Sequence, residues 1–406
     1  MQKGVFFMFG KIQKDTVGTL IAESLGTLIL SLALTRFLAP QDRGEYSTLV
    51  ALIFLLSFLG NNVHSRAIFF RKLDLNRAYI NTLLISLMIS TLTFSTTGSL
   101  LCFLLEDFTY AHLILVFFSS IGMAIYNFIV AIFSTQASHL YLRKFSQIAL
   151  LLQILSAFSV IFFQSPTIAL LFLSITFWIP ILVVSWKAYS FDLLKISRVS
   201  LPNLKFIKEN LFPRLLSLPV YISTFDALKL DIMLCSFYLG YESTGNYVAA
   251  TTLCVSLQFL YRFFFLSNIT SSQNWFLGKR KFFPILTYFI FGLIAALLFV
   301  FCLPFIFEFI FPRGYAINWI DFALIWCGNM LFWARRLLGD LFFHLNLDRW
   351  IGISEIFGAL CFVLILQINH PETLRDFSET YCFSLLSAFA MLCFVCITKT
   401  KKVHHF

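Results

Sequence analysis

The sequence predicts an all-α polytopic membrane protein with about 12 transmembrane helices, arranged in two six-helix lobes related by pseudo-twofold symmetry along the membrane normal. Three observations support this prediction: the composition, the spacing of the apolar stretches and an internal repeat. Of the 406 residues, 59% are hydrophobic and only 12% are charged, and the mean hydropathy is +0.85. Soluble domains are roughly half apolar and a quarter charged, and a soluble globule could not cover this much apolar surface. The composition excludes soluble enzymes, soluble binding modules and disordered proteins.

Twelve stretches are long and apolar enough to span a bilayer, which takes about 20 mostly apolar residues in a helix. The seventh is the least regular, because it carries Pro213, Pro219, Asp226, Lys229 and Asp231. Only Gln164, Ser165 and Pro166 separate the fifth from the sixth, which predicts a tight helical hairpin. The stretches lie at about residues 16–38, 45–63, 78–104, 111–134, 146–164, 167–187, 212–239, 245–268, 283–310, 316–337, 350–368 and 378–398.

The basic residues predict the orientation of these helices. With the N-terminus inside, 24 of the 30 Lys and Arg fall in inside segments. Because cytoplasmic loops carry an excess of Lys and Arg, both termini are expected to be cytoplasmic. This loop distribution explains the net charge of +10. A nucleic-acid-binding face would require the basic residues to cluster, and they are scattered between the apolar stretches. Four of the remaining six lie at outside ends and two lie within stretches: Arg36, Arg43, Arg313 and Arg375, then Lys229 and Arg262.

An internal repeat relates the two halves of the chain. Residues 37–46 align with residues 238–247, an offset of 201 (238 − 37 = 201), and this alignment places Gly44 on Gly245 and Tyr46 on Tyr247. The offset is close to half of the chain length, which indicates duplication of a six-helix unit. Six is an even number, so both copies enter the membrane from the same side. Transporters built from such parallel repeats place the substrate path between the halves.

The repeat divides the chain into three predicted parts. We expect an N-lobe at residues 1–188, a cytoplasmic linker at residues 189–211 and a C-lobe at residues 212–406. Around the end of the linker, apolar and charged residues alternate with helical spacing, which predicts a short amphipathic helix at the membrane surface. Its apolar face holds Leu204, Ile207 and Leu211, and its charged face holds Lys205, Lys208 and Glu209.

The first predicted hairpin carries a family motif. The segment Ala33-Leu-Thr-Arg-Phe-Leu-Ala-Pro-Gln-Asp-Arg-Gly-Glu-Tyr46 resembles the first-hairpin signature of O-antigen (Wzx-type) polysaccharide flippases, a branch of the multidrug/oligosaccharidyl-lipid/polysaccharide (MOP) exporter superfamily. Residues 231–240 and 245–247 resemble its counterpart in the second half, and the length, helix number and central loop also match the family. One position differs from the family motif: Ala39 stands where the family usually has a glycine before the proline. The matching positions are Arg36, Leu38, Pro40, Gly44 and Tyr46.

This resemblance implies a multi-pass flippase of the bacterial inner membrane. Such a protein moves an undecaprenyl-diphosphate-linked oligosaccharide, an O-antigen or capsule repeat unit of lipopolysaccharide or polysaccharide biosynthesis, from the inner to the outer leaflet by alternating access. Its implied partners are that substrate, membrane lipids and a polymerase or glycosyltransferases of the same pathway. We expect a monomer coupled to H⁺, Na⁺ or the membrane potential. The alternatives are a drug/cation antiporter of the same superfamily and an integral-membrane acyltransferase or glycosyltransferase.

Charged residues within or beside the apolar stretches are the candidate site residues, because a charge at the bilayer centre costs about 2.5–3.5 kcal/mol. An anionic diphosphate headgroup favours arginine and lysine as ligands. The same charges could instead pair with one another and hold helices together. The candidates for substrate binding are Arg36, Lys229, Arg262, Arg66, Arg335 and Arg336, and those for coupling or ion pairing are Glu23, Asp226, Asp231 and Asp340.

No catalytic residues, metal site or further cofactor are expected. The sequence contains no P-loop, so ATP hydrolysis by this chain is not predicted. Its nine cysteines fall within apolar stretches, where they are typical of small buried or lipid-facing residues. The predicted loops are also too short to hold the acidic metal-binding segments of a lipid-linked glycosyltransferase.

Overall fold

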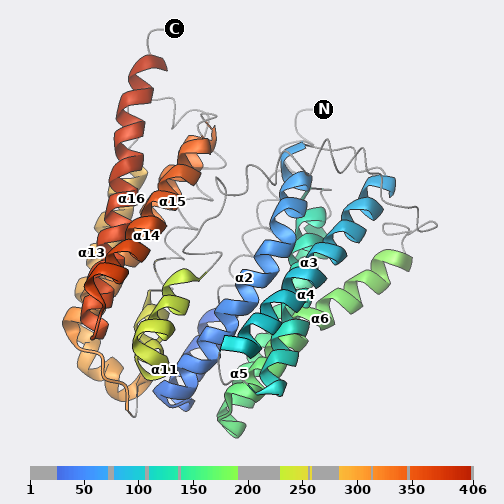
Figure 1. Ribbon diagram of the computed structural model, residues 1–406, viewed down its shortest axis with the longest axis horizontal. Coiled ribbons are helices and arrows are strands. Elements are labelled where there is room, and N and C mark those ends of the chain that lie inside the picture. The colour runs from blue at the N-terminus through green and yellow to red at the C-terminus, as the bar shows by residue number, and fades with distance from the viewer. Residues whose placement is uncertain are drawn as a thin grey trace, which may run out of the picture. The chain divides into compact units, whose positions relative to one another are not determined.

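The structure is a computed structural model, and it describes residues 25–71, 77–105, 109–135, 139–190, 229–254, 257, 283–311, 314–344 and 348–403. Within these ranges every regular element is a helix (Figure 1). A helix at Leu25–Phe37 comes first. It is followed by α2 (Pro40–Arg71), α3 (Arg77–Leu105), α4 (Tyr110–Thr135), α5 (His139–Phe163), α6 (Pro166–Ser190), α11 (Leu230–Leu253), α13 (Phe283–Ile310), α14 (Trp319–His344), α15 (Asp348–Asn369) and α16 (Leu374–Val403).

These helices confirm the all-α prediction, and each of the twelve predicted stretches overlaps one of them. In the part of the chain that the structure describes, six segments are long and apolar enough to cross a membrane, which makes this a multi-pass membrane protein. The number twelve and the symmetric two-lobe arrangement stay predictions. The six segments are Pro40–Asn61, Thr82–Leu100, Tyr110–Val130, Pro166–Val183, Trp350–Asn369 and Leu374–Cys396.

The predicted hairpin between the fifth and sixth stretches is present. Helix α5 ends at Phe163, and Gln164 adopts a left-handed conformation with φ of 47° while its N–H donates to the carbonyl of Val160 at 3.0 Å. This geometry is a common way to end a helix. Helix α6 then begins at Pro166, whose fixed φ and missing N–H suit the first helical position. The two helices consequently pack directly against each other.

Helix α11 is two helices joined at a break. Gly240 has φ of 78° and ψ of 178°, a region that is essentially restricted to glycine. The break separates the seventh predicted stretch from the eighth. In the first half of the chain, the equivalent break lies between Phe37 and Pro40, and the offset of 201 places Ala39 on Gly240 (39 + 201 = 240). The first repeat has no glycine at that position, and the following residue, Pro40, starts the next helix.

The chain forms two compact units, which do not follow the chain order strictly. The first unit comprises Met1–Leu34 and Leu49–Leu218, and the second comprises Thr35–Thr48 and Pro219–Phe406. Helix α2 therefore begins in the second unit and continues in the first. The predicted linker and its amphipathic helix lie outside the described residues, so the predicted domain boundaries stay predictions.

Hydroxyl groups and glycines join the helices of the first unit. Ser90 on α3 donates to the carbonyl of Gly60 on α2 at 2.8 Å, and a Cβ at Gly60 would lie 2.8 Å from Oγ1 of Thr91. Ser95 on α3 bonds Ser120 on α4 at 2.7 Å. Small and hydroxylated residues are the usual means of helix association in a bilayer, where burial of apolar side chains gives no net driving force between helices.

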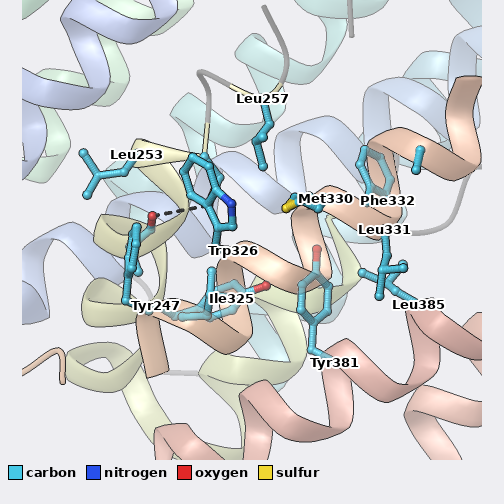
Figure 2. Close-up of a cluster of buried hydrophobic side chains, with 14 of the residues drawn as sticks. Tyr247, Leu253, Leu257, Ile325, Trp326, Met330, Leu331, Phe332, Tyr381 and Leu385 are labelled. Atoms are coloured by element: carbon cyan, nitrogen blue, oxygen red, sulfur yellow. Dashed lines mark hydrogen bonds between the residues drawn. The ribbon is translucent and has the colours of Figure 1, made fainter. Parts of the chain in front are cut away.

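An aromatic cluster forms the core of the second unit. The ring of Tyr247 on α11 meets Phe377 and Tyr381 on α16 edge-on, at centroid distances of 5.6 and 6.0 Å. Trp326 on α14 packs into the same core (Figure 2). Its indole N–H donates to the carbonyl of Gly292 on α13 at 3.3 Å. This core holds α11, α13, α14 and α16 together and provides the frame for the residues described next.

Candidate functional site

Two helix ends meet in the second unit through their glycines. A Cβ built on Gly44 of α2 would lie 1.8 Å from the carbonyl oxygen of Tyr241, and one built on Gly245 of α11 would lie 1.8 Å from the carbonyl oxygen of Pro40. The two contacts are reciprocal and share one offset (44 + 201 = 245 and 40 + 201 = 241). The glycines aligned by the internal repeat are thus the ones that let the two backbones touch. We call this contact the glycine crossing.

The loop between α13 and α14 binds both sides of the glycine crossing. The hydroxyl of Tyr315 donates to the carbonyl of Leu38 at 3.0 Å, just before α2. The next residue, Ala316, donates its backbone N–H to Oδ1 of Asn246 on α11 at 2.9 Å. Asn246 is itself buried. We call residues 314–318 the strap, because they bond to both hairpins.

The predicted site residue Arg36 lies two residues before Leu38, to which the strap bonds, and it is exposed. Its guanidinium donates to the carbonyl of Phe309 near the end of α13 and lies 5.7 Å from the centre of the Phe309 ring. These contacts hold the side chain against α13 while leaving it accessible. The side chain of Arg36 is therefore accessible, and its role in substrate binding stays a prediction.

Arg43 is buried at the glycine crossing, although the sequence suggested only a loop position for it. Its exposure is 3%, and its guanidinium lies 5.9 Å from the centre of the Tyr46 ring. Within the described ranges no carboxylate pairs with it, and its Nε has no hydrogen-bond partner. The available signal was its place between Pro40 and Gly44 in the repeated motif.

Asp231, predicted as a coupling or pairing residue, is buried in the first turn of α11. Its Oδ2 accepts a hydrogen bond from the hydroxyl of Tyr247 at 2.8 Å. In the described part of the chain its Oδ1 has no hydrogen-bond partner. Lys229 lies two residues earlier, half-buried, in a left-handed conformation with φ of 47°. The site thus holds one carboxylate oxygen that is buried and unsatisfied.

The predicted residue Arg335 forms a buried ion pair. Its Nη2 lies 2.8 Å from Oε1 of Glu355 on α15, and the two side chains are only 2% and 8% exposed. The sequence did not suggest Glu355 as a partner. The neighbouring Arg336 points differently: it is exposed, and its guanidinium lies 5.9 Å from the centre of the Trp333 ring. Two adjacent arginines therefore have separate environments.

The other predicted site residues are not described in full. Glu23, Asp226 and Arg262 lie outside the described residues, so their pairing with Asp231 or with one another stays a prediction. Arg66 lies on α2 and Asp340 on α14, but their side chains are not described. In the ranges that the structure covers, no group of three or more His, Cys, Asp or Glu is arranged to hold a metal.

A groove of about 670 Å³ opens where α15 turns into α16. Its lining is acidic, but two of the carboxylates already bond to neighbouring side chains. Asp376 accepts hydrogen bonds from the N–H and the hydroxyl of Thr373, and Glu379 pairs with Arg375 at 3.0 Å. The lining residues are Ile365, Asn369, His370, Glu372, Asp376, Glu379, Thr380 and Phe383.

Comparison with known proteins identifies the fold. No family model and no curated protein matches the sequence. Among solved structures, the chain is similar to the lipid II flippase MurJ in an inward closed conformation, with a TM-score of 0.68 and 14% identity over 94% of this chain and 87% of that one. It is also similar to an inward-facing multidrug resistance MATE family transporter of the MOP superfamily, with a TM-score of 0.61 and 12% identity over 96% and 98% of the two chains. The fold is therefore one shared by a flippase and a drug transporter.

Proposed function

We propose that this chain is a flippase that carries a polyprenyl-diphosphate-linked oligosaccharide across the bacterial inner membrane by alternating access. The fold likeness supports a transporter, and the first-hairpin motif supports the polysaccharide branch over the multidrug branch. The observation that carries the proposal is the glycine crossing, in which the two copies of that motif meet in direct backbone contact. An O-antigen or capsule repeat unit is the substrate we infer.

The glycine crossing suits a gate that opens and closes. Backbones in direct contact leave no room for water or headgroup, and the predicted orientation places this contact at the outer surface. Among the described residues, hydrogen bonds from Tyr315 and Ala316 tie the strap to the two hairpins. Each contributes about 0.5–1.5 kcal/mol net, so the gate could open at a cost that one transport cycle supplies.

Basic residues along the route would accompany the diphosphate headgroup, while the polyprenyl tail stays in lipid. We infer this role for Arg36, Lys229 and Arg262, and an inner entry role for Arg66 and Arg336. Arg335 is the weakest of the predicted ligands, because its pair with Glu355 already uses its charge. Asp231 is the coupling residue we infer, since one of its buried carboxylate oxygens has no hydrogen-bond partner among the described residues and can take up a proton or Na⁺.

The proposal predicts transbilayer movement of lipid-linked sugar by the purified chain alone. Proteoliposomes holding the chain and a fluorescent undecaprenyl-diphosphate oligosaccharide should expose the label to an external quencher faster than protein-free liposomes. A fluorescent polyprenol without the diphosphate is the matched control and should not move faster. Efflux of a cationic dye without lipid movement would instead establish the antiporter alternative. Turnover of a lipid-linked sugar donor would establish the transferase.

We expect Asp231→Asn to uncouple transport while the protein still folds. The amide oxygen can still accept the hydrogen bond from Tyr247, but the side chain no longer changes charge. Flipping driven by an imposed pH or Na⁺ gradient should fall about tenfold, equivalent to about 1.4 kcal/mol, to the rate without a gradient. Tyr247→Phe, the control, removes only a hydrogen bond and should keep its response to the gradient. A wild-type gradient response in Asp231→Asn would exclude this residue as the coupling group.

A further inference from the structure

Among the described residues, the glycine crossing holds a buried arginine without a carboxylate partner. Arg43 and Arg335 are comparably buried, at 3% and 2% exposure. Arg335 has Glu355 at 2.8 Å, as a buried guanidinium normally requires. Arg43 has no carboxylate partner within the described ranges, and its neighbours there include the Tyr46 ring and the Tyr315 phenol. Because arginine stays protonated in proteins, Arg43 keeps a full positive charge there.

The surrounding helix ends add positive potential instead of relieving it. Arg43 lies in the first turn of α2, and the second part of α11 starts at Tyr241, whose carbonyl meets Gly44. The N-terminus of a helix carries the positive end of its dipole, which disfavours a cation and favours an anion. Two such ends at one contact make the position costly for an arginine unless a negative group joins it.

Among the described residues, the neighbouring groups do not supply that negative charge. The Tyr315 phenol acts electrostatically on Arg43, but burial raises the pKa of Tyr315 to about 12, so it stays neutral. Asp42, the half-buried neighbour in sequence, forms no ion pair with Arg43 among the residues described. Glu242 is exposed on α11. The negative group is therefore expected to come from a ligand.

We propose that Arg43 belongs to an anion-binding site at the glycine crossing, which takes a phosphate group of the transported lipid when the crossing opens. This inference rests on the proposed flippase function for the source of the phosphate, but the chemistry needs only a tetrahedral oxyanion. A guanidinium presents parallel N–H donors that match two phosphate oxygens, and such bonds are about twice as strong as neutral ones. The crossing then releases its substrate by closing, because closure buries Arg43 and leaves no room for the anion.

The first test separates ligand binding from a structural role. Arg43→Met removes the charge and keeps much of the apolar stem, so flipping should fall at least tenfold while the melting midpoint of the purified protein stays equal or rises. Arg43→Lys should recover only part of the rate, since it offers a point charge. Arg375→Gln, an exposed arginine of the same unit, is the matched control and should flip normally. A parallel loss of midpoint and flipping in Arg43→Met would overturn the site.

The second test identifies the anion. Inorganic diphosphate and farnesyl diphosphate should each raise the melting midpoint of the wild type but not of Arg43→Gln, and farnesol should raise neither. A shift with farnesyl diphosphate alone would show that the lipid is required, and an equal shift in Arg43→Gln would overturn the site. An Arg43-dependent shift in a protein that does not flip lipid-linked sugar would refute the proposed function and retain the site. Flipping of lipid-linked sugar without an Arg43-dependent shift would refute the site and retain the proposed function.

Discussion

Gly44→Ala and Gly245→Ala should each abolish transport, more than a hundredfold, although the protein still inserts. The added Cβ would lie 1.8 Å from a backbone carbonyl oxygen, far inside any real contact distance. Neither neighbour is a flexible side chain that could move aside, so the two helices would have to separate along their whole contact. Closely packed interiors do not absorb such a displacement. The crossing would then fail to close, and the alternating cycle would stop.

The reciprocal geometry sharpens this prediction. Because each glycine faces the carbonyl four residues before the other, the two single changes should have equal effects. The double change should cost little more than either single one, since one separation accommodates both. Flipping in proteoliposomes measures the loss of transport. Labelling of an engineered thiol at Gln41 by an external impermeant reagent measures whether the glycine crossing fails to close.

Gly339→Ala is the matched control. It lies on α14 in the same unit, and its Cβ would meet Ile351 at 3.6 Å, an ordinary van der Waals distance. Alanine also favours the helix over glycine by about 0.8–1.0 kcal/mol. This variant should therefore transport normally with an equal or higher melting midpoint. Normal transport by Gly44→Ala would contradict the direct backbone contact.

Breaking the Arg335–Glu355 pair should have the largest effect on stability. Removing one partner leaves a buried charge without compensation, which costs about 3–5 kcal/mol. Arg335→Met and Glu355→Leu should each lower the abundance and the melting midpoint. The double change should restore much of both, because well-packed apolar residues can replace a buried ion pair. Unfolding in detergent, followed by intrinsic fluorescence, measures these differences.

The same variants decide what Arg335 does. If it is structural, the double variant should flip substrate at nearly the wild-type rate. If it binds the headgroup, as the sequence alone allowed, the double variant should be stable and inactive. The exposed pair Arg375–Glu379, with side chains 54% and 52% accessible, is the control. Exposed i,i+4 pairs contribute only about 0.3–0.5 kcal/mol, so Arg375→Gln should hardly change the midpoint.

The sequence by itself determined the elements of this protein. A bilayer accepts only backbone that satisfies its own hydrogen bonds, so long apolar stretches had to be helices. The ends were also encoded, since Pro166 starts α6 and Pro40 starts α2. The repeated motif even identified Gly44 and Gly245, although the reason for their glycines was not visible in it.

The lateral arrangement was decided only by the tertiary structure. Hydropathy places a residue along the membrane normal, but lipid and a neighbouring helix are equally apolar, so it does not tell which helix faces which. Arg335 and Arg336 look alike in the sequence, yet Arg335 is buried in a pair with Glu355 on α15 while Arg336 is exposed beside the Trp333 ring. Likewise, Arg43 resembles a loop residue in the sequence, but in the structure it is buried beside the contact between the helix ends at Pro40 and Tyr241. Packing between helices, and not composition, determined that Arg335 has a carboxylate partner while Arg43 has none among the described residues.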